Sequence, residues 1–267
     1  MNDWIRVALA ASLEASRAIL DIYESDDVGV EYKEDQSPLT RADRAAHDVL
    51  MRHLEPTGIP VLSEEGKHMP YSERQEWREL WIVDPVDGTK EFIKRNGEFT
   101  VNVALVRDGR VAGGVVLAPV LGHAYVGVVG EGAWRLEVDL TQVPSVDEAW
   151  SARASLPFDA PAARPFTVVA SRSHMSPETE AYVEEARSRH GEVDLISKGS
   201  SLKLCMVAEG TADAYPRFAP TMEWDTAAGQ AICEAAGCVV LDQNTNAPMR
   251  YNREELLNAW FLVSRTN

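Results

Sequence analysis

The sequence predicts a mixed α/β (α+β) fold from three observations: helical periodicity near the N-terminus, alternating apolar runs in the middle, and strands interleaved with helices in the second half. Of the 267 residues, 45% are hydrophobic and 25% are charged, which is the composition of a folded globular protein. The chain carries 26 Lys and Arg against 42 Asp and Glu, a formal net charge of −16. Such an acidic chain is not expected to bind nucleic acid, because phosphate contacts need a basic face.

Two helices are expected before the sheet. Apolar residues from Asp3 to Tyr23 recur at the 3.6-residue spacing of an amphipathic helix. Thr40 followed by Asp43 is typical of a helix start, and this second helix is expected to end before Pro56. A meandering, mostly antiparallel sheet is then predicted from the apolar runs Ile59–Leu62, Leu80–Val83, Phe99–Val106, Val111–Leu117, Ala124–Val129 and Trp134–Val138.

Prolines between Leu140 and Pro165 predict a connection between an N-terminal α+β subdomain, residues 1–150, and a C-terminal α/β subdomain, residues 151–267. In the second half, strands alternate with helices. The expected strands are Phe166–Ala170, Val193–Ile196, Asp213–Tyr215, Val239–Leu241 and Trp260–Val263. The expected helices are Pro177–His190, Ser201–Glu209 and Asp225–Ala236.

Cysteine usage and hydropathy bear on the compartment. The cysteines are Cys205, Cys233 and Cys238, an odd number without CxxC spacing, so neither a disulfide framework nor secretion is indicated. We expect a cytoplasmic protein without a transmembrane segment, because no stretch approaches the ~18 apolar residues of a membrane span. No heptad or apolar stripe marks an interface, which leaves a monomer or a homodimer open.

The segment from Leu80 to Ile93 carries the strongest chemical signal. Asp84 lies at the end of an apolar strand, which Pro85 is expected to stop. The turn that follows brings Asp87 toward Asp84. Two close carboxylates repel each other unless a cation lies between them. Mg²⁺ prefers such oxygen ligands, and the carbonyl of Val86 offers another.

Residues outside this segment extend the pattern. Asp-x-x-Asp-Gly alone also fits a solvated turn. Glu64 and Glu65, however, end the preceding apolar run, so adjacent strand ends would aim several carboxylates at one point. Asp225 begins a later helix, where capping is its alternative role. The amides after Gly88 open a short helix, whose N-terminus attracts phosphate.

Taken together and in this order, the blocks 64–65, 81–89 and 224–229 resemble the signature of the inositol monophosphatase superfamily of Mg²⁺-dependent, Li⁺-sensitive phosphatases. Within it, the blocks 37–43, 88–102, 199–203 and 215–220 look like the bacterial 3′(2′),5′-bisphosphate nucleotidases of the CysQ type. The resemblance implies a layered αβαβα sandwich with its metal site between the two halves. It also implies hydrolysis of the 3′-phosphate of adenosine 3′,5′-bisphosphate, or of 3′-phosphoadenylyl sulfate, in sulfur metabolism.

The resemblance further implies roles for single residues. Two or three Mg²⁺ ions would be held by Glu64, Asp84, Asp87, Asp225 and the carbonyl of Val86. Thr89 and Asp43 would form a hydrogen-bonded pair that, with Glu64, orients and deprotonates the attacking water. The expected substrate contacts are Gly88, Thr89, Ser200, Lys203, Arg217 and His174.

Alternatives remain at this stage. Inositol phosphate or fructose 1,6-bisphosphate would fit the same metal chemistry, and a non-catalytic nucleotide sensor would fit the same fold. Thr89 and Asp43 argue against the sensor, since a pure binder would not need them. Lys203, between two leucines, would equally suit an exposed helix face. The resemblance also leaves peripheral association with the inner membrane open, although no basic amphipathic anchor is present.

Overall fold

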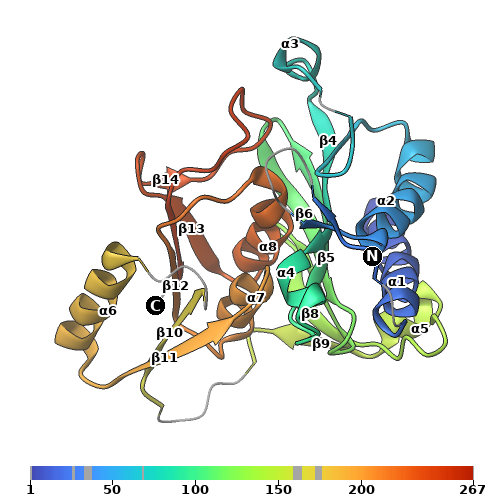
Figure 1. Ribbon diagram of the computed structural model, residues 1–267. Helices are drawn as coiled ribbons and strands as arrows, with labels where there is room; N and C mark the ends of the chain where they lie inside the picture. Colours follow the sequence, from blue (N-terminus) through green and yellow to red (C-terminus); the bar gives the residue numbers. More distant parts are fainter. Residues whose placement is uncertain are drawn as a thin grey trace.

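The computed structural model describes residues 2–25, 28–32, 38–67, 69–158, 164–171 and 176–266. Two large sheets organise the chain, with helices between and outside them (Figure 1). In the first sheet the strands follow one another in chain order from β3 to β9. They are β3 (Val61–Ser63), β4 (Glu79–Asp87), β5 (Thr100–Arg107), β6 (Arg110–Ala118), β7 (His123–Val128), β8 (Gly132–Glu137) and β9 (Arg153–Leu156).

The first sheet is the predicted antiparallel meander, with one parallel pair, β3 and β4, at its edge. Helices α1 (Asp3–Tyr23) and α2 (Arg41–Leu54) pack together and cover one face of it (Figure 1). The short elements around them are β1 (Glu31–Tyr32), β2 (Pro38–Leu39), η1 (Glu55–Thr57), α3 (Tyr71–Arg74), α4 (Thr89–Ile93) and α5 (Val146–Ser151).

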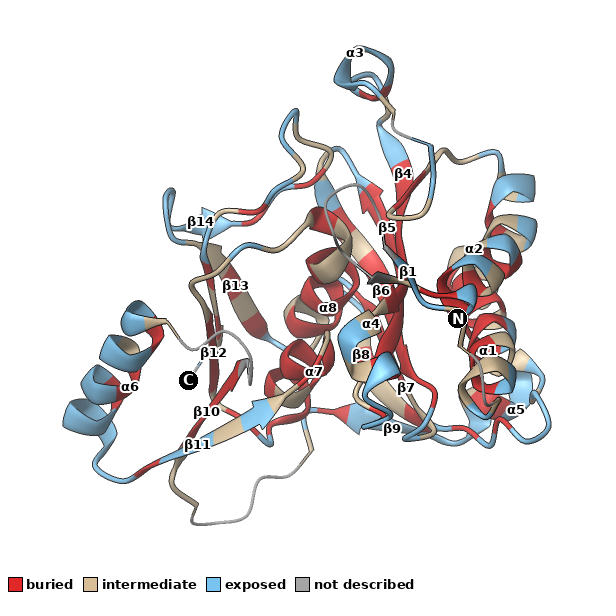
Figure 2. Cartoon of the chain, viewed as in Figure 1, coloured by how far each residue is buried: buried red, intermediate tan, exposed pale blue. Residues whose placement is uncertain are grey.

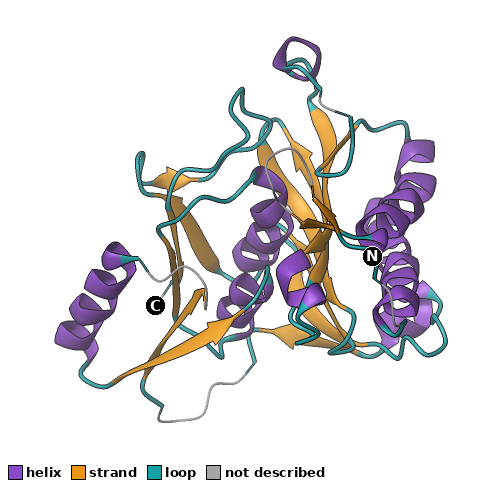
Figure 3. Ribbon diagram, viewed as in Figure 1, coloured by secondary structure: helices purple, strands orange, loops and turns teal. Residues whose placement is uncertain are grey.

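The second sheet has the order β11-β10-β12-β15-β13-β14 and mixes parallel and antiparallel pairs. Its strands are β10 (Phe166–Ser171), β11 (Val193–Lys198), β12 (Ala214–Arg217), β13 (Cys238–Asp242), β14 (Ala247–Pro248) and β15 (Phe261–Arg265). Its helices are α6 (Pro177–His190), α7 (Leu202–Glu209) and α8 (Glu223–Ala235). Helix α6 covers the outer face, while α7 and α8 lie between the two sheets (Figure 3).

Helices and sheets therefore alternate in the predicted αβαβα order: α1 and α2, the first sheet, α7 and α8, the second sheet, then α6. Figure 2 shows that α7 and α8 are buried along most of their length, as helices with a sheet on either side must be. No helix in the described ranges is long and apolar enough to cross a membrane.

Two differences from the sequence analysis concern prolines. Pro85 does not stop its strand: β4 continues to Asp87, and the pairing with β5 shifts register between Asp84 and Asp87. The proline-rich stretch after Leu140 is more than a connection, because it contains α5 and also β9, which pairs with β8 beyond residue 150. The division into two subdomains at that residue stays a prediction.

Glycines set how closely α8 approaches the first sheet. A Cβ added to Gly127 on β7 would lie 2.5 Å from the Cα of Ile232, and one added to Gly114 on β6 would lie 2.7 Å from the Cα of Ala228. These neighbours are helix backbone atoms, which cannot move aside as a flexible side chain does. The helix thus rests almost directly on the sheet.

We predict that Gly127→Ala destabilises the protein by about 1–3 kcal/mol, the usual cost of overpacking a filled core. Urea denaturation followed by circular dichroism measures the change. Gly58→Asn is the control, because a Cβ at Gly58 meets nothing within 4 Å and Asn tolerates its left-handed backbone. Equal stability of Gly127→Ala and the wild type would show that the contact is not tight.

Candidate functional site

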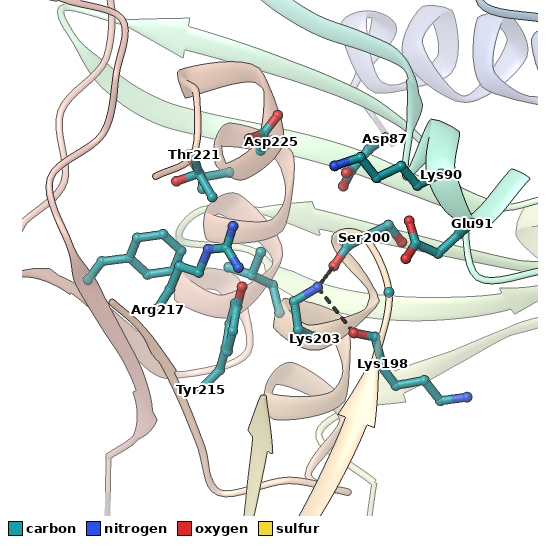
Figure 4. A pocket seen from close by; sticks show the side chains of 15 residues that line it. Asp87, Lys90, Glu91, Lys198, Ser200, Lys203, Tyr215, Arg217, Thr221 and Asp225 are labelled. Atoms are coloured by element: carbon teal, nitrogen blue, oxygen red, sulfur yellow. Dashed lines mark hydrogen bonds between the residues drawn. The ribbon is translucent and has the colours of Figure 1, made fainter. Parts of the chain in front are cut away.

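Three carboxylates from both halves of the chain meet between the sheets. Asp84 and Asp87 lie on β4, and Asp225 lies in the first turn of α8. One oxygen of each lies within 4.8 Å of the others, a spacing that would suit shared coordination of a metal ion. Figure 4 shows Asp87 and Asp225 on facing elements at one end of a cavity.

The irregular end of β4 brings its two carboxylates together. Asp84 pairs with Asn102 and Asp87 with Thr100, so β4 carries one residue more than β5 over this stretch. This is a β-bulge, and Pro85, which has no N–H to donate, lies inside it. The N–H of Val86 turns back to donate to Asp84 Oδ1 at 3.0 Å. The proline thus re-aims the strand rather than ending it.

Burial and mutual repulsion disfavour the charged forms of this cluster. The pKa of Asp84 is raised well above its usual value, first by burial and then by Glu64, Asp87 and Asp225. Burial, followed by the charge of Asp87, also raises the pKa of Asp225. A bound divalent cation would remove this penalty, and the all-oxygen donor set fits Mg²⁺.

Glu64 adjoins the cluster at the end of β3. Its N–H donates to Val83 O at 3.1 Å, which continues the parallel pairing of β3 with β4 by one residue. Its half-buried side chain lies close enough to Asp84 to raise the pKa of that carboxyl. Glu64 therefore lies beside Asp84, but it is not part of the group of three carboxylates whose oxygens lie within 4.8 Å of one another.

Asp43 joins the capping of α2 to the site. Its Oδ2 accepts from the N–H and the hydroxyl of Thr40 at 2.7 and 2.6 Å, the capping box expected from the sequence. Its Oδ1 accepts from Thr89 Oγ1 at 3.3 Å, and Thr89 Oγ1 also lies 3.3 Å from Val86 O. One buried carboxylate thus fixes both a helix start and the Thr89 hydroxyl.

Cationic side chains form the opposite wall of the cavity (Figure 4). Lys203 is buried, so the exposed helix face considered above is wrong. Its Nζ donates to Ser200 O at 2.6 Å and lies 5.5 Å from the centre of the Tyr215 ring, while burial lowers its pKa to about 8. Arg217 Nη2 donates to Pro220 O at 2.9 Å.

Two polar atoms of this wall have unused hydrogen-bonding capacity. Arg217 Nε and Ser200 Oγ are buried and have no hydrogen-bond partner within the described part of the chain. Buried donors rarely stay unpaired in native proteins, and both residues line the cavity, so a polar ligand there would find two unused partners. Gly88 lines the same cavity, with φ of +95°. His174, the remaining predicted contact, lies outside the described residues.

The sequence analysis missed the polar groups behind Asp87. Ser201 occupies the N-cap position of α7, yet its hydroxyl makes no capping hydrogen bond and lies 2.8 Å from Asp87 Oδ2. Asn102 contacts the same oxygen at 3.3 Å. The available signal was a polar amide within the apolar run Phe99–Val106, where an unpaired polar group would be costly.

Known proteins resemble this chain along nearly its whole length. The model of the inositol monophosphatase family matches residues 1–264. The 3′(2′),5′-bisphosphate nucleotidase CysQ of Shigella flexneri is 46% identical over 255 residues, which cover 94% of this chain and 95% of that protein. In sequence, the match therefore reaches both the strand-end carboxylates and the cationic wall.

Solved structures also resemble this chain along nearly its whole length. The crystal structure of CysQ from Bacteroides thetaiotaomicron, a bacterial member of that family, superposes with a TM-score of 0.90 at 48% identity, covering 100% of this chain and 98% of the other. The extragenic suppressor protein suhB of Bartonella henselae, 21% identical, superposes with a TM-score of 0.74 and covers 99% of this chain and 94% of its own. At that identity the second comparison establishes the fold alone.

The raised pKa values predict a pH-dependent stability of the metal-free protein. Asp84 and Asp225 bind protons more tightly when folded than when unfolded, so their contribution is present at low pH and is lost as pH rises through the folded-state pKa. In EDTA we therefore expect the free energy of unfolding to increase as pH falls from 7 to 5, by up to ~1.4 kcal/mol per pH unit for each group. Each kcal/mol of added stability raises the Tm by ~2–4 °C.

Differential scanning fluorimetry measures this profile, and excess Mg²⁺ should flatten it. Glu223, whose pKa burial raises to about 7, acts in the same direction, so Asp225→Asn is the variant that isolates the share of the cluster. A metal-free profile that is the same for Asp225→Asn and the wild type would contradict the electrostatic description of the site.

Proposed function

The chain belongs to the inositol monophosphatase family, and on that premise we propose that it is a Mg²⁺-dependent 3′(2′),5′-bisphosphate nucleotidase. It would hydrolyse the 3′-phosphate of adenosine 3′,5′-bisphosphate, or of 3′-phosphoadenylyl sulfate, leaving the 5′-nucleotide and phosphate. The observation that carries this proposal is a carboxylate cluster facing a cationic wall across one cavity. The nucleotidase relatives, similar over nearly the full chain, support the choice of substrate over inositol phosphate or fructose 1,6-bisphosphate.

Enzymes of this family use Mg²⁺, and the acidic cluster offers the ligands it prefers. We propose that two or three ions are held by Glu64, Asp84, Asp87, Asp225 and the carbonyl of Val86. Bound Mg²⁺ would supply charge stabilisation for the phosphate and a more acidic water at neutral pH. The cluster comes from two separate parts of the chain, so the site is complete only when α8 packs against the first sheet.

The pair of Asp43 and Thr89 is proposed to orient the attacking water. Thr89 Oγ1 lies 3.3 Å from both Asp43 Oδ1 and Val86 O, and its single hydrogen serves one of them. When it donates to Asp43, which as an ionised carboxylate only accepts, its lone pairs are free on the other side. That arrangement would let Thr89 accept a hydrogen bond from water, with Glu64 as the second acceptor. The capping contacts of Thr40 keep Asp43 from turning away.

The cationic wall is proposed to bind the phosphate that is not cleaved. Arg217 has an unpaired buried Nε, and Ser200 has an unpaired hydroxyl on the same cavity. Lys203 adds a charge whose position is fixed by the carbonyl of Ser200. In a protein of net charge −16, such a local cationic group is needed to attract a bisphosphate. The amides of Gly88 and Thr89 would meet the phosphate that is cleaved.

A phosphate-release assay tests the proposal on adenosine 3′,5′-bisphosphate, inositol 1-phosphate and fructose 1,6-bisphosphate. We expect the highest kcat/KM for the nucleotide, and no activity in EDTA. Asp87→Asn should lose activity by a factor of at least ~10² because it loses a metal-binding charge, while its circular dichroism stays native. Stoichiometric nucleotide binding without phosphate release would instead identify a sensor.

Thr89→Ala should lower kcat by about 10²–10⁴, the range for a group that positions a proton transfer, while Mg²⁺ binding by calorimetry stays near wild type. Thr89→Ser is the matched control, because it keeps the hydroxyl that donates to Asp43. An effect of Thr89→Ala on KM alone would assign Thr89 to substrate binding.

A further inference from the structure

Asn102 is a buried amide in the middle of an apolar strand. It lies on β5, where the strand is buried from Thr100 to Val106, and only 1% of its surface is exposed. A buried amide is costly unless its hydrogen bonds are made. The hydrogen-bond partners of its amide nitrogen and oxygen therefore indicate its role.

The hydrogen bonds of Asn102 are all made, and they lead to Asp87. Its Oδ1 accepts from Thr100 Oγ1 at 3.0 Å, which fixes the orientation of the amide. Its Nδ2 lies 3.0 Å from Ser201 Oγ and 3.3 Å from Asp87 Oδ2. An ionised carboxylate only accepts hydrogen bonds, so the nitrogen, rather than the oxygen, must face Asp87.

Ser201 completes the contact from the other half of the chain. Its Oγ lies 2.8 Å from Asp87 Oδ2 and 2.7 Å from Asp225 O, and it is 1% exposed. The same hydroxyl accepts from Asn102, so its own hydrogen serves Asp87 or the Asp225 carbonyl. A single side chain thus links the end of β4, the interior of β5 and the first turn of α8.

We propose that Asn102 and Ser201 are positioning residues for the metal site, an inference that rests on the proposed function. Asn102 donates to Oδ2 of Asp87 from behind, and the Ser201 hydroxyl lies between that oxygen and the carbonyl of Asp225. They also fix the separation of Asp87 and Asp225 before any cation arrives. Neither residue is among those that line the cavity.

The physical reason for such a device is the repulsion within the cluster. Oxygens of Asp84, Asp87 and Asp225 lie within 4.8 Å of one another, so their like charges drive the carboxylates apart when no cation is bound. Donors that hold Asp87 from behind oppose that separation and so reduce the reorganisation that metal binding must offset. Outer partners of metal ligands typically affect affinity 10–100-fold.

The test compares Mg²⁺ binding to substrate-free protein by isothermal titration calorimetry. We expect Asn102→Ala and Ser201→Ala each to raise the Mg²⁺ Kd about 10–100-fold, and the double variant to raise it by less than the product, because the two residues act on one oxygen. Ser201→Thr, which keeps the hydroxyl, should recover most of the affinity.

Ser16→Ala is the matched control for removal of a buried hydroxyl. Ser16 lies on α1, and its Oγ has no hydrogen-bond partner among the described residues, so Mg²⁺ binding should be unchanged. Should Asn102→Ala fail to fold, Thr100→Val keeps the shape of the side chain and frees the amide to rotate. It is expected to weaken Mg²⁺ binding in the same direction by a smaller factor.

A second readout separates positioning from general stability. The KM for adenosine 3′,5′-bisphosphate at saturating Mg²⁺ should change less than twofold, while the Mg²⁺ concentration for half-maximal activity rises with the Kd.

Folded variants with wild-type Mg²⁺ Kd overturn the positioning role and leave the proposed function intact. If the wild type binds Mg²⁺ but releases no phosphate, the proposed function fails and the calorimetric comparison still decides the positioning role. A wild type that binds no Mg²⁺ overturns both.

Discussion

The constraint on which the structure depends is the close approach of like charges in a buried place. Asp84, Asp87 and Asp225 offer oxygens within 4.8 Å of one another, and because Asp84 is buried and the other two are half-buried, water screens their repulsion only in part. A fold can keep such a cluster by holding each carboxylate rigidly, by supplying a cation or by protonating a member of the cluster. The hydrogen bonds and packing around the site hold the carboxylates in place and so prepare the cluster for a cation.

Two structural features position the three carboxylates. Asp84 and Asp87 depend on the bulge at Pro85, which places two residues of one strand on the same side. Asp225 depends on α8, whose distance from the sheet is limited by contacts at Gly114 and Gly127. Because these features lie on separate elements, the distances between the carboxylates depend on how the whole layered core packs.

Elements with a regular local pattern were predicted from the sequence, whereas features that depend on residues far away in the sequence were missed. The long helices α1, α2 and α6 follow from periodicity and capping residues such as Thr40 and Ser176, so their bounds were predicted closely. The strand β9 was missed because its four residues are too short for a pattern and are paired only at the sheet edge. Pro85 was taken as a strand end since a bulge is visible only from the register of the partner strand.

Side-chain environment was the harder part of the site. Asp84, Asp87 and Asp225 stand in motifs that can be read along the chain, whereas the burial of Lys203 and the use of the Ser201 hydroxyl are set by neighbours across the fold. Ser201 is 114 residues from Asp87 and 99 from Asn102. A local pattern therefore suggests a cap at Ser201, and tertiary contact assigns its hydroxyl differently.

The loop from Lys198 to Ser201 explains how the acidic and cationic walls keep one geometry. Its start is tied to Glu98, which accepts from Gly199 N at 3.0 Å and from Lys198 Nζ at 3.3 Å, and its end is tied to Asp87 through Ser201. Its carbonyls hold Lys203. A displacement of this loop would move the ammonium of Lys203 and the carboxylate of Asp87 together, so the two walls behave as one unit rather than as independent parts.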